Sequence, residues 1–135
     1  MIALDTNILI RLLVRDDPGQ TALAEQLLQA AADAGEQCFI SDPVLCEVEW
    51  VLESNYRAKR GDVLAAMQEL FAGDLFVFED REVLRRVILR YQQSKADFSD
   101  CLIGAKAQAR GARTTYTFER VLAQEQGFTR LTGIS

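Results

Sequence analysis

The sequence has no histidine among its 135 residues. That absence excludes a histidine general base, a Ser-His-Asp triad and a histidine-ligated zinc ion. The three cysteines are odd in number and lack the C-x-x-C spacing, so neither a disulfide framework nor a cysteine-ligated metal is expected. No apolar run approaches the ~20 residues that span a bilayer, and the first charge is Asp5 rather than the lysine or arginine of a signal peptide. We therefore expect a cytoplasmic protein without a membrane segment.

The length and composition suit one globular domain. Hydrophobic residues make up 49% of the chain, which is enough for one ordinary core. No linker, internal repeat or low-complexity segment interrupts the sequence. We expect a single domain over residues 1–135.

Charge is distributed unevenly along the chain, whose formal net charge is −5. Residues 16–56 contain nine acidic and no basic side chains, whereas residues 81–130 contain ten basic and five acidic ones. The basic half can supply one face for nucleic acid despite the acidic total. Alternatively, these charges only solvate helix surfaces. The sequence leaves both interpretations open.

Strand and helix patterns alternate along the chain. Short apolar runs predict strands at residues 2–4, 37–41, 75–78, 113–116 and 128–131. Periodicity and helix propensity predict helices at residues 8–13, 21–32, 43–56, 62–72, 80–93 and 97–110, with a short helix near 119–124. We expect a break at residues 16–19, N-caps at Asp42 and Asp62, and a helix end at Gly111. Such alternation, with few hairpin signals, predicts an α/β fold with a mostly parallel sheet.

With histidine and cysteine excluded, catalysis must rest on carboxylates. Four segments place acids where strands end or helices begin, which is where open α/β sheets hold their sites. Asp5 ends the first strand, where it can serve chemistry or simply cap the next helix. Glu47 and Glu49 flank the apolar arc of the helix over residues 43–56, so periodicity does not choose between them, and either can be a solvated flank.

The third segment carries Asp97 and Asp100, which lie three residues apart at a helix start and about 60° apart around its axis. The pair can act as an N-cap and a dipole partner. However, their face continues with Gly104 and Ala107, opposite an apolar stripe. We therefore expect this helix to be packed on both sides, with its acidic end in a crevice.

The fourth segment carries Glu119, with Thr117 as the expected N-cap of a short helix. Parallel strands can carry all four segments to one edge of the sheet. Carboxylates gathered there within ~5 Å repel one another by on the order of 4 kcal/mol per pair at an effective dielectric of about 20, so the cluster must protonate or hold cations. Oxygen ligands alone select Mg²⁺ or Mn²⁺. Such an ion can activate water for attack on a phosphodiester.

The first two segments resemble the opening motifs of the PIN-domain family. Residues 4–7 (LDTN) are similar to the first motif, and residues 41–52 (SDPVLCEVEWVL) are similar to the second. The second resemblance places the family's glutamate at Glu47 and not at Glu49.

The other two segments resemble the later motifs of the same family. Residues 96–105 (ADFSDCLIGA) are similar to the third, with Asp100 as the principal acid and Asp97 as its companion. Residues 115–120 (TYTFER) are similar to the fourth, with Glu119 where aspartate is usual. The four matches run in the expected order from residue 2 to about residue 122, and a chain of this length resembles the VapC-type toxins of bacterial toxin–antitoxin pairs.

This resemblance implies a three-layer α/β/α fold with a central, mostly parallel sheet. The implied activity is that of a Mg²⁺-dependent endoribonuclease, in which Mn²⁺ can substitute, acting on RNA such as tRNA or ribosomal RNA stem-loops. The implied partners are a second copy of the chain in a homodimer and a small DNA-binding antitoxin that inhibits the toxin.

The resemblance also implies roles for individual residues. The implied catalytic set comprises Asp5, Glu47, Asp97, Asp100 and Glu119. Of these, Asp5 and Asp100 would hold the metal, and Glu47 would bind it directly or through water. The other two acids would complete the outer shell, while Thr6 and Thr117 would orient carboxylates or phosphate.

Two other classes of function remain open. A phosphatase of the haloacid dehalogenase type also begins with a strand-end aspartate nucleophile, but it needs a second aspartate two residues later, where this sequence has Asn7. A non-catalytic RNA-binding or interaction module would carry the same acids as structural groups. A phosphoaspartate at Asp5 would favour the phosphatase, and only a cleavage assay distinguishes a nuclease from the module.

Overall fold

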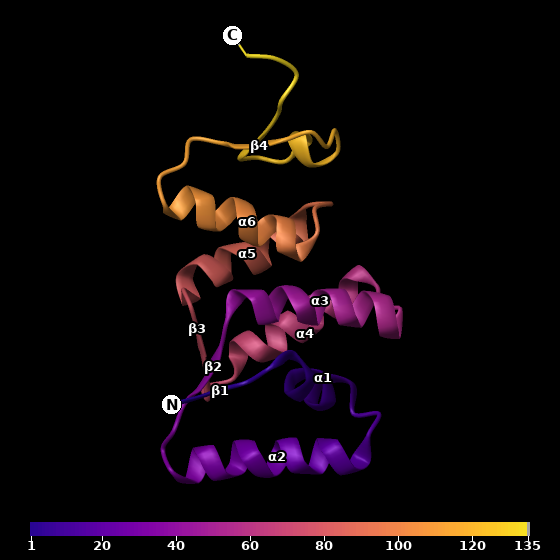
Figure 1. Ribbon diagram of the computed structural model, residues 1–135, viewed down its shortest axis with the longest axis vertical. Coiled ribbons are helices and arrows are strands. Elements are labelled where there is room, and N and C mark those ends of the chain that lie inside the picture. The colour runs from indigo at the N-terminus through magenta and orange to yellow at the C-terminus, as the bar shows by residue number, and fades with distance from the viewer. Residues whose placement is uncertain (135) are drawn as a thin grey trace. The chain divides into compact units, whose positions relative to one another are not determined.

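The computed structural model describes residues 1–134, in which six α-helices, one 3₁₀ helix and five strands alternate (Figure 1). Contacts between residues group the chain into two compact units. The first is Met1–Arg81, and the second begins at Glu82.

The first unit is built around a three-stranded parallel sheet. Its strands are β1 (Ile2–Ala3), β2 (Cys38–Ile40) and β3 (Phe76–Phe78), in the order β1-β2-β3. Cys38 of the central strand is paired with Ile2 on one side and with Phe76 on the other. Each pairing of parallel strands requires a long crossover connection, and helices supply it here.

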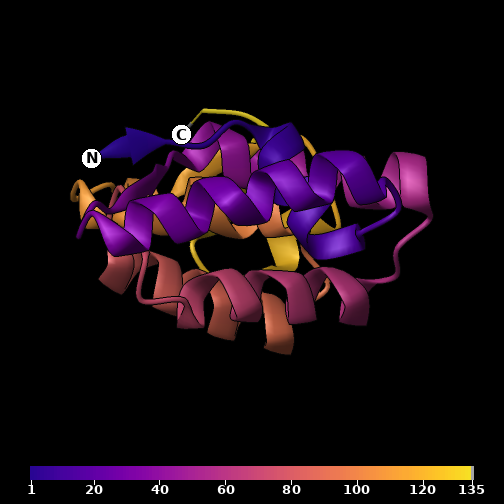
Figure 2. The ribbon, with the colours of Figure 1, turned by 90° about the horizontal axis from the view of Figure 1, so that it is seen from below.

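Four helices form these crossovers. Helices α1 (Thr6–Val14) and α2 (Pro18–Asp33) connect β1 to β2, and α3 (Asp42–Tyr56) and α4 (Arg60–Ala72) connect β2 to β3. Helix α1 packs against both α2 and α3 (Figure 1). Figure 2 shows this unit from below, with α2 nearest the viewer. The side chains buried most completely in these elements are apolar, among them Leu9, Ile40, Leu45, Val48, Val63 and Met67.

The N-terminus of α2 differs from the expected break at residues 16–19. Pro18 begins the helix, and Asp17 is its N-cap, with Oδ1 accepting a hydrogen bond from the backbone N of Gln20 at 3.1 Å. Proline suits a first helical position because its φ is already helical and its missing N–H would have no partner there. The prediction that the helix starts at Thr21 was therefore three residues too late.

The predicted caps of α3 and α4 are also displaced. Ser41, not Asp42, caps α3, and its Oγ accepts from the N of Val44 at 3.4 Å. Lys59 occupies the N-cap position of α4, and Asp62 lies three residues inside, where its carboxylate accepts from the N of Lys59 at 3.0 Å. Both aspartates thus act at helix starts, but from inside the first turn, where a negative charge complements the helix dipole.

The second unit pairs two helices with a two-stranded parallel sheet. Helices α5 (Arg81–Gln93) and α6 (Phe98–Ala109) contact through the rings of Tyr91 and Phe98, whose centroids lie 5.8 Å apart in an edge-on arrangement. Strands β4 (Thr115–Thr117) and β5 (Phe128–Arg130) are separated by a 3₁₀ turn at Leu122–Gln124. The predicted short helix near residues 119–124 is reduced to that turn.

The predicted α/β class with a parallel sheet is confirmed, since every strand pair in the described residues is parallel. Gly111 has φ +91° just after α6, in the conformation that glycine adopts most readily at a helix end. None of the helices in the described part is long and apolar enough to cross a membrane. The single domain over residues 1–135 stays a prediction.

Candidate functional site

Asp5 lies at the junction between β1 and α1. It is the N-cap of α1, and its Oδ1 accepts a hydrogen bond from the backbone N of Thr6 at 2.7 Å. The capping interpretation is therefore correct for this residue. The cap engages only one of the two carboxylate oxygens. The exposed side chain of Asp5 can therefore have a second role.

Thr6 connects the first segment to the second. Its side chain is buried, with 4% of its surface exposed, and its Oγ1 donates to Oε2 of Glu47 at 3.2 Å. Glu47 comes from α3, 41 residues later in the chain. In the first unit, the carboxylates of Asp5 and Glu47 thus both accept hydrogen bonds from Thr6, one from its backbone N and the other from its hydroxyl.

The two glutamates that periodicity left equivalent differ in the structure. Glu47 is exposed and hydrogen-bonded to Thr6, whereas Glu49 is buried, with 4% of its surface exposed. The interpretation of Glu49 as a solvated flank was wrong. Helical periodicity gives no information on the neighbouring elements, which cover one flank of the helix and leave the other exposed.

Glu79 is an acid of this sheet edge that sequence reasoning missed. It directly follows β3, and its Oε2 accepts from the backbone N of Asp42 at 2.7 Å. It thereby satisfies one of the N–H groups that lack an intrahelical partner at the start of α3. Its position could have indicated this role, since Glu79 directly follows β3 and Asp5 lies only two residues after β1. Its hydrogen bond helps to build the helix that carries Glu47.

In the second unit, Asp97 occupies the N-cap position of α6, with φ −65° and ψ 157°. Its side chain makes no capping hydrogen bond, although its backbone O accepts from the N of Cys101 at 3.0 Å. The capping interpretation is therefore correct for the backbone of Asp97 but wrong for its carboxylate. Asp100 lies in the first turn and is partly exposed.

Helix α6 is packed on two faces, as predicted. Phe98 and Leu102 are buried, and so is Gly104 on the face that the two aspartates share. A Cβ at Gly104 would lie 2.9 Å from the ring of Phe128, which is closer than real contacts allow. A side chain at this position would therefore force the ring of Phe128 to shift away from the helix.

Thr117 and Glu119 follow a different local pattern from the one expected. Thr117 ends β4, and its Oγ1 accepts from the backbone N of Glu119 at 3.1 Å. This bond closes a turn, and no helix begins between Thr117 and the 3₁₀ turn at Leu122. Thr117 was wrongly predicted as a helix cap, but its hydroxyl does hold the backbone at the exposed Glu119.

The five candidate acids are divided between the two units: Asp5 and Glu47 in the first, and Asp97, Asp100 and Glu119 in the second. Within residues 1–134, no three acidic or cysteine side chains form a group that could hold a metal ion. The first unit supplies a pair, joined through Thr6, and carboxylate oxygens are the donors that Mg²⁺ and Mn²⁺ prefer.

The three cysteines are not among the candidate metal ligands. None of the three forms a disulfide within the described residues, and Cys38 and Cys101 are buried. Burial raises the pKa of the Cys38 thiol, and the charge of Glu36 adds to that effect. A thiol that stays protonated is a poor nucleophile and a poor metal ligand.

Comparison with known proteins identifies the family. Residues 2–127 match the model of the PIN domain family. A VapC ribonuclease of Aquifex aeolicus (strain VF5) is 28% identical to this chain over 120 residues, which cover 89% of this chain and 88% of the relative. The family match includes all four acidic segments, most of the first unit and the second unit as far as residue 127. The chain therefore belongs to the PIN domain family, as its motifs predicted.

Proposed function

We propose that this chain is a divalent-metal-dependent endoribonuclease that acts as the toxin of a toxin–antitoxin pair. The observation that carries the proposal is the contact of Thr6 with Glu47, which joins the first two family motifs in space. The match over residues 2–127 and the similarity to a VapC ribonuclease support the class of activity.

The proposed metal ligands are Asp5, Glu47 and Asp100, with Asp97 and Glu119 in the outer shell. The donor set fits Mg²⁺, with Mn²⁺ as a substitute, because it consists of carboxylate oxygens only. When bound, the ion supplies a water of lowered pKa and stabilises negative charge on the phosphodiester. The hydrogen bonds of Thr6 support the assignment of Asp5 and Glu47 as ligands. The match of its segment to the third family motif supports the assignment of Asp100.

The protein's own groups would hold this site in place. The hydrogen bond from the N of Thr6 orients the Asp5 carboxylate, and the hydroxyl of the same threonine orients Glu47. Such hydrogen bonds from neighbouring residues fix the direction in which a carboxylate presents its lone pairs to a metal. Thr6 therefore orients both ligands of the first unit.

The proposed partners follow from the same assignment. The substrate would be structured RNA such as a tRNA or ribosomal RNA stem-loop, and the inhibitor a small DNA-binding antitoxin. The chain would work as a homodimer of single-domain subunits in the cytoplasm. A gene for a small protein that overlaps the start of this one would support the toxin assignment.

The phosphatase and the non-catalytic module are weaker candidates. A phosphatase of the haloacid dehalogenase type requires a second aspartate two residues after the first, and this chain has Asn7 at that position. The family match is to the PIN domain and not to such a phosphatase. A binding module accounts for the fold but gives no reason for a buried threonine that bonds an exposed glutamate beside a strand-end aspartate.

A cleavage assay tests the proposal directly. We expect purified protein to make internal cuts in a pool of tRNA and ribosomal RNA in Mg²⁺, to stop in EDTA, and to resume with added Mg²⁺ or Mn²⁺. Asp5→Asn, purified in parallel, controls for contaminating nucleases, because asparagine keeps the cap but loses the charge. Cutting that persists in EDTA, or binding of RNA without any cutting, would overturn the proposal.

A further inference from the structure

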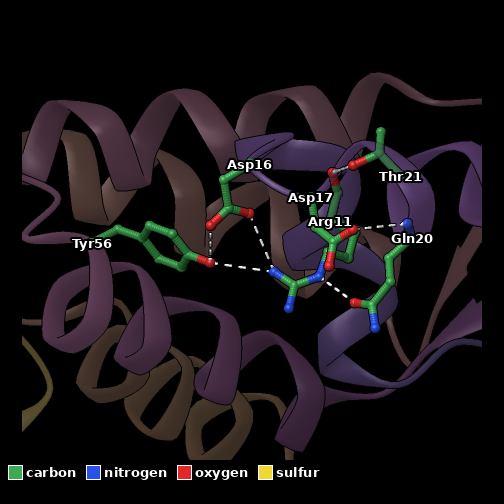
Figure 3. A network of polar contacts seen from close by, with 6 residues as sticks. All are labelled: Arg11, Asp16, Asp17, Gln20, Thr21 and Tyr56. Carbon is green, nitrogen blue, oxygen red and sulfur yellow. Dashed lines mark hydrogen bonds and ion pairs between the residues drawn. The ribbon is translucent and has the colours of Figure 1, made fainter.

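The last part of α1 is joined to two other helices through one guanidinium group (Figure 3). Arg11 donates from Nε to Oε1 of Gln20 at 2.5 Å. Its Nη1 donates to Oδ1 of Asp16 at 3.2 Å and to the hydroxyl of Tyr56 at 3.3 Å. Gln20 belongs to the first turn of α2, and Tyr56 is the last residue of α3. Arg11 therefore connects three helices of the first unit.

Three of these side chains form a closed set, which we call the Arg11 network: Arg11, Asp16 and Tyr56. The hydroxyl of Tyr56 donates to Oδ2 of Asp16 at 2.9 Å, so both oxygens of that carboxylate are engaged. The hydrogen bond with Tyr56 raises the pKa of Arg11, and the charge of Asp16 adds to that effect. Each member contacts the other two, which fixes their geometry more tightly than a single pair would.

The Arg11 network connects α1 to α3 at a different point from the bond between Thr6 and Glu47. The two connections are five residues apart on α1 and nine residues apart on α3, which correspond to about 7.5 Å and about 13.5 Å along the helix axes. Packing of α1 against α3 already restricts its motion, and polar connections at two different points further restrict the direction in which α1 crosses α3.

That crossing direction bears on the proposed metal ligands. Asp5 directly precedes α1, and Glu47 is part of α3. A rotation of α1 on α3 would change the separation of the two carboxylates. A metal site requires its ligands to be held within about 0.5 Å of the productive geometry.

We propose that the Arg11 network positions Asp5 relative to Glu47 so that both carboxylates can bind one divalent cation. This inference rests on the proposed function, because it concerns the same carboxylates. The network lies at the opposite end of α1 from Asp5, so its members are positioning residues and not ligands. Partly exposed charge pairs contribute little to stability, so stability alone is a weak reason for a polar network at this junction.

Replacing Tyr56 by phenylalanine removes the hydroxyl and keeps the ring. For Tyr56→Phe, we expect the calorimetric Kd for Mn²⁺ to rise about 10- to 100-fold, the range found when groups that orient metal ligands are lost. The Mg²⁺ concentration that gives half-maximal RNA cleavage should rise in parallel. The rate at saturating Mg²⁺ should stay close to that of the wild type. A merely structural role would lower the melting temperature of the metal-free protein and leave the Kd unchanged.

A matched control is available in the same region. Glu25→Gln removes the ion pair between Arg15 and Glu25, which joins the end of α1 to α2 and does not involve α3. We expect its Kd for Mn²⁺ to equal that of the wild type. Asp16→Asn tests the Arg11 network from a second member, should Tyr56→Phe fold poorly.

The outcomes separate this inference from the proposed function. Mn²⁺ binding by the wild type, with unchanged affinity in Tyr56→Phe and Asp16→Asn, would overturn the positioning role and leave the nuclease assignment intact. A wild type that binds neither Mn²⁺ nor Mg²⁺ would overturn both. Weaker binding in these variants, with Glu25→Gln unaffected, is the result that the inference requires.

Discussion

The two units of this chain carry opposite formal charges. The first, residues 1–81, has fifteen acidic and six basic side chains, or −9, whereas the second has nine basic and five acidic ones, or +4. The proposed substrate is a polyanion, so its phosphates are attracted to the second unit and repelled by the first. The acidic unit can approach RNA only where its charge is locally neutralised, and a bound divalent cation would do that at Asp5 and Glu47.

The units also differ in how they hold their candidate acids. In the first, Asp5 accepts a capping hydrogen bond and Glu47 accepts one from Thr6. In the second, Asp97 sits at a cap position without making the side-chain bond, and Glu119 lies on an exposed turn. The carboxylates of the first unit thus have structural partners as well as a proposed chemical role. The geometry does not support a structural role for the Asp97 side chain, because that side chain makes no capping hydrogen bond.

The largest effect is expected at Asp100. Asp100→Asn should lower RNA cleavage by at least about 100-fold, since the loss of a ligand costs no less than the loss of a group that supports one. It should leave the melting temperature in EDTA unchanged or slightly higher, because a repelling charge is removed from the acidic end of α6. Thermal melts in EDTA beside a cleavage assay in Mg²⁺ measure both quantities.

A purely structural Asp100 would reverse that pattern. As a partner of the α6 dipole only, it would contribute about 0.3–1 kcal/mol to stability, and its replacement would leave cleavage intact. Loss of stability with full activity would remove Asp100 from the proposed site and break the contrast between the units.

An intermediate effect is expected from neutralising exposed arginines of the second unit. Arg86 and Arg113 are exposed, whereas Arg85 is paired with Glu82 and Arg90 donates to Gln126, so the first two can be changed with the least structural consequence. The double change of Arg86 and Arg113 to Gln should reduce the slope of log K against log salt by about 1.4–1.8 if each contacts one phosphate. RNA binding measured across a salt series gives the slope.

The first unit supplies the control for this measurement. Arg57 and Lys59 are exposed cations of the acidic unit, and their double change to Gln removes the same total charge. We expect the slope to be unchanged in this control. Equal reductions in both double variants would mean that RNA responds to net charge alone, and that the division between the units has no role in binding.

The smallest effects concern helix caps. Asp17→Ala should cost about 1 kcal/mol of stability, because Oδ1 of Asp17 accepts a real capping bond from Gln20. Asp97→Ala should cost clearly less, because its side chain makes no such bond. If Asp97 belongs to the outer shell of the metal site, its replacement should instead lower cleavage about 10-fold or more. Urea unfolding and cleavage assays on both variants would measure these differences. Equal losses of stability in the two variants would contradict the expected difference between the two caps.

Much of the local structure could be predicted because its causes lie within a few residues. The strand at residues 2–4 and the cap at Asp5 follow from an apolar run that ends in a good cap residue. The errors at helix starts have the same local origin. Ser41 and Asp42 are both favourable caps, and only the backbone geometry distinguishes them. Pro18 stands in a turn-like segment and therefore indicates the end of a helix, although proline is equally suited to the first position of α2.

The candidate site could be predicted only as a set of positions. Its acids were found by their places at strand ends and helix starts and by their resemblance to family motifs. Neither argument contains the burial of Glu49 or the bond from Glu79 to the start of α3, which joins residues 37 positions apart. The contact of Arg11 with Tyr56 spans 45 positions and follows no periodicity.

The sequence by itself determined the α/β class, the order of the elements, the absence of histidine chemistry and the membership of the PIN domain family. These depend on composition, on short-range periodicity and on motifs that are contiguous in the chain. Only the tertiary structure decided that Thr6 bonds Glu47, that Glu49 is buried and that α1 is attached to α3 at both of its ends. Those contacts depend on how helices pack across a sheet, and helix packing is set by side chains that are distant in the sequence and adjacent only once the chain has folded.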